Sequence, residues 1–119
     1  MNDKNSSKAV PLDDRVQIAY KVVTGDMQSL GLRRNPNIIT YPVGEWYTLP
    51  EEDVVPGKDD FGGVWAKHKL SEAKRLTRYM MMKKSVKTRI FKAYVDRILY
   101  ENSCSLKTNG VFLEEEIHF

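Results

Sequence analysis

Two well-separated segments alternate residues with a period of two, and this alternation constrains the fold more than any other feature of the sequence. The first segment sets Val16, Ile18, Tyr20 and Val22 against Gln17, Ala19, Lys21 and Val23. The second runs from Thr88 to Leu99 and places Phe91, Ala93 and Val95 on one face, with Ile90, Lys92, Tyr94 and Asp96 on the other. Successive side chains of a strand point to opposite faces. Both segments therefore predict strands; the first should turn its Ile18, Tyr20 and Val22 face inward, and the second should be central.

Shorter apolar runs between Pro and Gly residues predict further strands at Ile38 to Tyr41, Glu45 to Leu49 and Val64 to Ala66. Gly62 and Gly63 permit a tight entry into the last of these, because glycine takes positive φ without steric cost. The dipeptide Asn109-Gly110 is typical of a two-residue hairpin turn, and it predicts that 106–108 pairs with 111–113. Residues Met27 to Leu32 suggest a short helical turn.

One segment has helical spacing. Ser71 is the expected N-cap, and Glu72 lies in the first turn, where the helix dipole favours an anion. A helix of about 12 to 14 residues should follow and end at Lys83-Lys84-Ser85. Its two faces differ: Ala73, Leu76, Thr77 and Met80 should pack on the sheet, and Arg75, Arg78 and Met82 should point away.

These elements predict an α+β fold, with a mostly antiparallel sheet of about five or six strands and one main helix packed on one face. The connections are too short for repeated parallel crossovers. We expect residues 15–119 to form this single domain. Residues 1–14 are rich in Asn, Ser, Lys and Asp, and we expect a disordered N-terminal tail there.

Positive charge is concentrated in one stretch. From Lys67 to Lys92 the chain carries ten Lys or Arg residues against one acid, Glu72. The whole chain has 19 basic and 16 acidic residues, so the remainder is acidic. A local excess of one sign raises the concentration of partners of opposite charge. The alternative is a solvated basic face whose Lys stems cover apolar neighbours.

Arginine and aromatic side chains in this stretch favour a phosphate-containing ligand. An Arg fork matches phosphate oxygens, and an exposed aromatic ring stacks on a base. The predicted ligand-binding residues are Lys74, Arg75, Arg78, Tyr79, Lys83, Lys84, Lys87 and Arg89, with Arg33 and Arg34 as a second basic pair on a loop. We expect a non-enzymatic binding module for a nucleotide or nucleic acid, without cofactor or metal.

Two other classes of function stay open. Met81 and Met82 are large apolar residues beside the basic face, and they suggest that another molecule covers this face. The acidic loop from Glu51 to Asp60 of a second copy could do so, which would give a homo-oligomer. An E-x-E pair near a chain end, here Glu114 and Glu116, occurs in arginine-specific ADP-ribosyltransferases. The Ser-Thr-Ser-like element of those enzymes is missing, because the middle segment here is Gly62-Gly63-Val64-Trp65. The acids also fit protection of an edge strand.

Other features of the sequence limit the expected location of the protein and its chemistry. Cys104 is alone, which excludes an internal disulfide, and its neighbours read as a turn. His68 and His118 lack the spacing of a metal site or catalytic triad. No apolar run approaches the roughly 18 residues that a membrane span needs. The polar residues 1–8 lack a secretory signal, so a cytoplasmic location without membrane contact is expected.

The order of short motifs resembles small uncharacterised α+β proteins of bacteria and their phages. It runs from Tyr20-Lys21-Val22-Val23 through Tyr41-Pro42-Val43-Gly44, Gly62-Gly63-Val64-Trp65 and Leu70-Ser71-Glu72-Ala73 to Arg89-Ile90-Phe91, and covers most of the chain from Tyr20 to Ile117. By analogy with phage biology, the resemblance implies sequestration of a nucleotide signal, with binding but no turnover.

Overall fold

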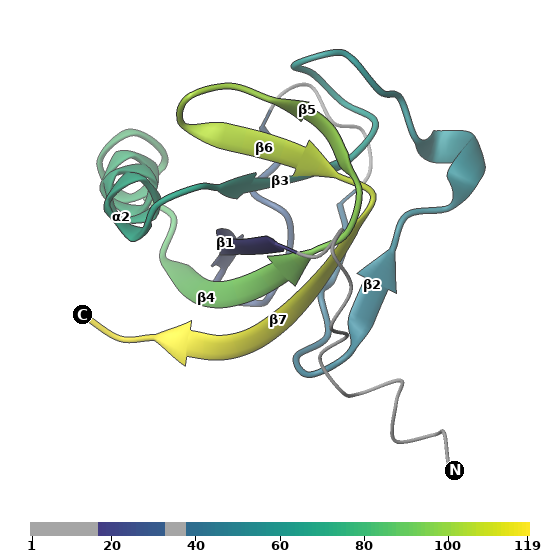
Figure 1. The fold of residues 1–119 in the computed structure, drawn as a ribbon. Coiled ribbons are helices and arrows are strands. Elements are labelled where there is room, and N and C mark those ends of the chain that lie inside the picture. The colour runs from purple at the N-terminus through teal and green to yellow at the C-terminus, as the bar shows by residue number, and fades with distance from the viewer. Residues whose placement is uncertain (1–16, 33–37) are drawn as a thin grey trace, which may run out of the picture.

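The computed structural model describes residues 17–32 and 38–119, and these form a seven-stranded antiparallel sheet with one α-helix (Figure 1). The α+β class and the antiparallel sheet agree with the sequence prediction, while the sheet has more strands than predicted. The expected N-terminal tail, residues 1–14, and the basic pair Arg33 and Arg34 lie outside the described residues.

The sheet has the spatial order β2-β7-β4-β1-β3-β6-β5. Its strands are β1 (Gln17–Thr24), β2 (Trp46–Thr48), β3 (Val64–Lys67), β4 (Thr88–Val95), β5 (Ile98–Glu101), β6 (Ser105–Thr108) and β7 (Gly110–Ile117). The helical elements are the 3-10 turn η1 (Glu51–Asp53), the α-helix α2 (Leu70–Tyr79) and the π-helical turn η2 (Met80–Lys84). Figure 1 shows α2 beside the curled sheet, close to β1 and β3.

The sheet consists of two halves that meet between β1 and β3. β1 pairs with β4 along its whole length, from Gln17 opposite Val95 to Thr24 opposite Thr88. Its pairing with β3 has one register partner, Tyr20 opposite Lys67. The two strands therefore diverge on either side of this pair, and the half formed by β3, β6 and β5 curls over the half formed by β2, β7, β4 and β1 (Figure 1).

The main hydrophobic core lies between these halves. It contains buried residues of both: Ala19, Val23, Phe91, Ala93, Val95, Val111 and Leu113 from one half, and Val64, Ala66 and Leu106 from the other. The predicted face of β4 with Phe91, Ala93 and Val95 is confirmed. The predicted inner face of β1 is confirmed at Val22, which is 3% exposed, and is wrong at Ile18, which is 48% exposed. Lys21, from the supposed outer face, is buried.

Helix α2 covers the other face of β1 and β4. Ala73 packs there against Val22 and Ile90 in a second buried cluster. This is why the alternation of β1 is uninformative: both faces of a central strand are covered, so neither one has to be polar. Ala73, Thr77 and Met80 are buried, as predicted for the inner helix face.

The start of the helix differs from the prediction, whereas its end agrees with it. Lys69 is the N-cap residue and makes no side-chain capping bond, so the prediction of Ser71 as N-cap is wrong. At the other end Ser85 takes a left-handed conformation, with φ of 56°. Its N–H donates to Met81 O and that of Val86 to Met80 O, both at 3.1 Å. These bonds satisfy carbonyls left open by the last, widened turn.

The expected hairpin at Asn109-Gly110 is also wrong. β6 pairs with β3 and β5, whereas β7 pairs with β2 and β4, so the chain passes here from one half of the sheet to the other. The side-chain oxygen of Asn109 accepts a hydrogen bond from the N–H of Arg97 at 3.0 Å, and its carbonyl accepts one from the N–H of Leu49 at 2.8 Å. Asn109 thus fixes a corner between three segments.

Three other predicted elements change. The strand expected from Thr88 to Leu99 is divided, because β4 ends at Val95 and β5 begins at Ile98 in the other half. The helical turn expected at Met27 to Leu32 is replaced by an isolated antiparallel bridge between Gln28 and Thr40. Of the strand expected at Ile38 to Tyr41, only this bridge at Thr40 is present in the described residues. Strands β2 and β3 lie where the sequence predicted them.

Gly63 makes room for a buried lysine. Lys107 on β6 has an exposed fraction of 0%, and its ammonium donates to the carbonyls of Val55 at 2.5 Å and Phe61 at 3.0 Å. A Cβ at Gly63 would lie 2.4 Å from Cγ of Lys107. The predicted tight entry is confirmed at Gly62, which has φ of +93°.

Replacing Gly63 with Ala should lower the free energy of unfolding by about 1 to 3 kcal/mol, because the added methyl overpacks the site against the Lys107 stem. Chemical denaturation measures this. The matched control is Gly25→Ala, where the new Cβ would meet only Lys87 O at 3.9 Å. The control should keep or slightly raise stability. Equal losses in both variants would contradict the packing of Lys107 on Gly63.

Candidate functional site

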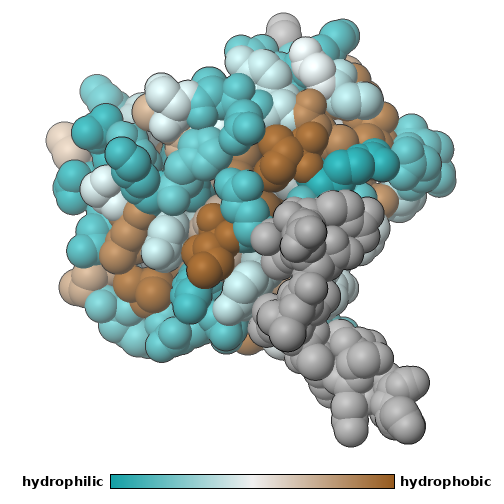
Figure 2. All heavy atoms as spheres, in the orientation of Figure 1, coloured by the Kyte–Doolittle hydropathy of each residue, from teal (hydrophilic) through white to brown (hydrophobic). Residues whose placement is uncertain are grey.

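Most of the predicted binding residues form one exposed surface on α2, η2 and the segment leading into β4. We call this the basic surface and define it by the exposed side chains Arg75, Arg78, Tyr79, Lys83, Lys84 and Lys87. Figure 2 shows mainly hydrophilic side chains over the position that α2 has in Figure 1. Met82, beside these cations, is 77% exposed. The predicted outward side of the helix is therefore cationic and partly apolar.

A shallow groove of about 400 Å³ crosses the basic surface. It is lined by Arg78 and Lys87, with Met81, Val86, Thr77 and Thr88 between and beside them. The groove thus holds two cations on an apolar floor. An elongated ligand with anionic groups fits a surface of this kind better than it fits an enclosed pocket.

Two of the predicted binding residues have other partners. Arg89 donates from Nε and from one terminal nitrogen to the two carboxylate oxygens of Glu116, at 3.0 and 2.7 Å. This hydrogen bonding raises the pKa of Arg89 and lowers the pKa of Glu116. Lys74 is half-buried, with its ammonium 5.2 Å from the ring centroid of Phe119. Neither residue is presented to solvent like the members of the basic surface.

The C-terminal acids pair across strands. Glu114 on β7 lies 3.4 Å from the ammonium of Lys92 and accepts a hydrogen bond from the hydroxyl of Tyr94 at 3.3 Å. The hydrogen bond from the Lys92 ammonium to Glu114 raises the pKa of Lys92. Together with the pair between Arg89 and Glu116, these contacts join β7 to β4. The transferase alternative stays a prediction, and the observed contacts give both acids a structural role.

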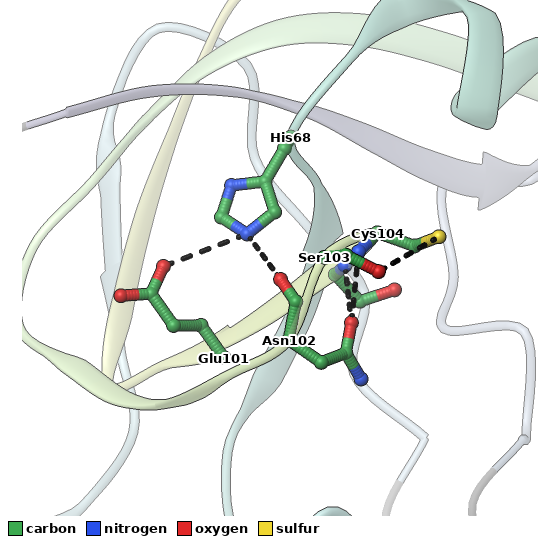
Figure 3. A network of polar contacts seen from close by, with 6 residues as sticks. His68, Glu101, Asn102, Ser103 and Cys104 are labelled. Atoms are coloured by element: carbon green, nitrogen blue, oxygen red, sulfur yellow. Dashed lines mark hydrogen bonds and ion pairs between the residues drawn. The ribbon is translucent and has the colours of Figure 1, made fainter.

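His68 and Cys104 belong to a turn network and do not face one another (Figure 3). Nε2 of His68 lies 3.0 Å from the carbonyl oxygen of Asn102 and 3.5 Å from a carboxylate oxygen of Glu101. The Asn102 side chain accepts a hydrogen bond from the N–H of Cys104 at 2.9 Å, and the Cys104 sulfur points away, 3.8 Å from the hydroxyl of Ser103. This agrees with a turn position for Cys104.

In residues 17–32 and 38–119, no cluster of three or more His, Cys, Asp or Glu side chains is arranged to hold a metal ion. No helix in the same ranges has both the length and the apolar character that a membrane span requires.

A second candidate site, which sequence analysis missed, is a cavity of about 220 Å³ where β1 and β3 diverge. It is lined by residues of β1, β3, α2 and the loop after β1, including Tyr20, Lys21, Val22, Leu30, Tyr41, Trp65, Lys67 and Leu76. Val22 faces α2 and Lys21 faces the main core. Because lining residues come from both faces of β1, the cavity lies in the opening between the two halves of the sheet.

Lys21 is the most unusual group in this cavity. Its exposed fraction is 6%, its ammonium donates to the carbonyl of Trp65 at 2.8 Å, and it lies 5.0 Å from the centroid of the Tyr41 ring. Within the described part of the chain no carboxylate forms an ion pair with it. Burial lowers the pKa of Lys21 to about 7, because a charged amine loses its hydration there.

The neighbours of Lys21 extend the polar part of the cavity. The ammonium of Lys67 donates to the hydroxyl of Ser105 at 2.9 Å, and both residues line the cavity. Burial raises the pKa of Tyr41 to about 12, so its phenol is neutral at pH 7. A perturbed lysine in a concave site is a marker of function. The sequence held no signal for it, since Lys21 reads as an outward polar residue of an alternating strand.

No family model matches the chain, and neither the curated proteins nor the solved structures contain a match to it. The chemistry of both candidate sites therefore rests on the residues described above.

Lys21→Met should change how stability depends on pH. The unfolded chain holds this proton up to the ordinary pKa of 10.5, whereas the folded chain releases it near 7. Between these values the unfolded state binds more protons, so this group makes the wild type more stable as pH rises, by at most about 1.4 kcal/mol per pH unit.

Urea denaturation from pH 6 to 10 measures this difference. The stability of the wild type minus that of Lys21→Met should increase between pH 7 and 10 and stay level below pH 7. The pKa of Lys107 is also lowered by burial, but it contributes equally in both proteins and cancels. Parallel pH profiles of the two proteins would contradict a lowered pKa at Lys21.

Proposed function

We propose that the protein is a non-enzymatic binding module for nucleic acid, which it holds through the basic surface. The observation that carries the proposal is the availability of the cations. Arg78, Lys83, Lys84 and Lys87 are exposed, and none of them forms an ion pair with an acid of the described residues. Protein cations that are free of acids are available to replace the counterions of a phosphate backbone.

The remaining members of the basic surface support the same ligand. Arg75 lies 3.4 Å from Glu72, but an exposed pair of this kind is worth little and a phosphate can displace the acid. Arg75 and Arg78 are one helical turn apart, so their forks reach neighbouring phosphates on one face. Tyr79 is exposed beside them and offers a ring on which a base can stack.

The shape of the surface favours a polymer over a single nucleotide. The cations extend along α2, through η2 and towards β4, and the groove between Arg78 and Lys87 is shallow. A mononucleotide would contact few of them at a time, whereas a strand would contact many. Sequestration of a small nucleotide, which the resemblance to phage proteins implies, is the less favoured form of the proposal.

The test is fluorescence anisotropy with a labelled 15-nucleotide oligothymidine as probe. Arg78→Ala with Lys87→Ala should weaken binding at least about tenfold, since a single lost charge-assisted hydrogen bond is worth roughly 1.5 to 3 kcal/mol. Loss of two phosphate contacts should also reduce the slope of log affinity against log salt by about 1.4 for a single strand. Circular dichroism should show unchanged folding.

The matched control removes two cations elsewhere, with Lys58→Ala and Arg97→Ala. Lys58 is an exposed loop residue, and Arg97 lies 3.6 Å from Glu51. The net charge of this control equals that of the double variant on the basic surface, so non-specific attraction is equal. If both double variants bind the probe alike, the basic surface is not the binding site.

Self-association is the second candidate, because Met81 and Met82 are exposed beside the cations and Glu51, Glu52 and Asp53 are exposed on η1. In that case the acidic loop of one copy would cover the basic surface of another. The molecular mass in solution would then fall as salt rises, in the absence of any nucleic acid. A monomer at every salt and protein concentration would contradict self-association.

A further inference from the structure

We propose that the cavity between β1 and β3 binds a small carboxylic acid with an apolar or aromatic body, and that Lys21 supplies the counter-charge for its carboxylate. This site is separate from the basic surface. Lys21 in the cavity is buried, whereas the lysines and arginines of the basic surface are exposed. The walls of the cavity are largely apolar.

Lys21 is incompletely paired. An ammonium group has three N–H donors, and among the described residues the Trp65 carbonyl is the one hydrogen-bond acceptor that Lys21 reaches. Buried charges in proteins are generally paired with an opposite charge, because an unpaired one costs several kcal/mol of lost hydration. A ligand carboxylate in the adjoining cavity would supply both the missing acceptors and the missing charge.

Other polar groups also line the cavity. Lys67 reaches it from β3, where its ammonium donates to the hydroxyl of Ser105. Among the described residues the ring of Tyr41 also lies beside Lys21, and its phenol is neutral at pH 7 because burial raises its pKa to about 12. An anion entering this space therefore meets two lysines and a neutral phenol.

The size of the cavity and the nature of its walls suit a ring that carries a carboxylate. Cavities of about 150 Å³ with apolar walls accommodate benzene. The cavity here, at about 220 Å³, has room for one ring with a carboxylate attached. Leu30 and Leu76 supply aliphatic wall, and Trp65 supplies an aromatic ring whose Nε1 donates to Asp60 O at 3.0 Å and is thereby fixed in orientation.

Binding of a carboxylate should be coupled to proton uptake. Because burial alone holds the pKa of Lys21 near 7, part of the protein has a neutral amine at pH 7.5. A bound carboxylate favours the ammonium form. The amine therefore takes up a proton from the buffer as the ligand binds.

The experiment uses benzoate as probe, with benzamide as its neutral analogue and inorganic phosphate as an anion without an apolar body. Titrations are followed by the backbone amide NMR signals of the intact protein. Benzoate should shift signals around the cavity, such as those of Gly31 and Ala66, and should bind at least tenfold tighter than benzamide or phosphate. Calorimetry in two buffers of different ionisation enthalpy should detect proton uptake at pH 7.5.

Variants assign the effect to the site. Lys21→Met should weaken benzoate binding at least tenfold and abolish proton uptake. Lys67→Met, which leaves Lys21 in place, should weaken binding severalfold and retain uptake, and it serves as the test if Lys21→Met does not fold. Lys84→Met removes an exposed cation and should change neither quantity.

Three results would overturn the proposal. They are an absence of benzoate shifts in the wild type at tens of millimolar, equal binding of benzoate and benzamide, or unchanged benzoate binding in folded Lys21→Met. Benzoate shifts that are confined to residues of the basic surface would overturn the proposal in the same way as an absence of shifts. Because none of these results involves an oligonucleotide, they leave the proposed nucleic-acid function to its own test.

Discussion

The hydrogen bond from the Lys21 ammonium to the Trp65 carbonyl spans the point where β1 and β3 diverge, and the architecture of the cavity follows from that divergence. The strands share one register pair, Tyr20 with Lys67, so the halves of the sheet curl apart and leave a cavity. Carbonyls of a diverging strand lose their ladder partners, and a lysine donor replaces one of them. The fold thereby keeps a cation in its interior, next to a space that a small ligand can enter.

The two candidate sites use the same charge in opposite physical settings. On the basic surface, water and salt screen the cations, so each contact is weak and affinity comes from many contacts to one long anion. In the cavity a single cation is nearly dehydrated, so one well-placed anion changes its protonation as well as its energy. This contrast explains why we assign a polymer to the first site and a small acid to the second. It also separates the two in experiment, since salt governs the first and proton linkage marks the second.

Local patterns predicted what depends on local physics. The buried faces of α2 and β4 follow from spacing, because each element must bury one apolar face. The exposed cations were predictable for the same reason. Partner choice was not predictable: Asn109-Gly110 resembles a hairpin turn, yet the two flanking strands pair with other strands instead of with each other, and the dipeptide forms a corner. Lys21 was missed because the sequence does not reveal that a central strand is covered on both faces, and only the tertiary divergence of β1 and β3 gives a buried amine an acceptor.

The central claim is that Lys21 is a desolvated amine with no counter-charge among the described residues, and its own titration tests this most directly. Selective labelling of lysine side chains with ¹³C at Cε, with the Lys21 signal assigned by its absence in Lys21→Met, reports the pKa of this one group in the folded protein. The account predicts a midpoint near 7 for Lys21. A midpoint near the ordinary 10.5 would contradict it, because the ammonium would then be hydrated or paired with an acid.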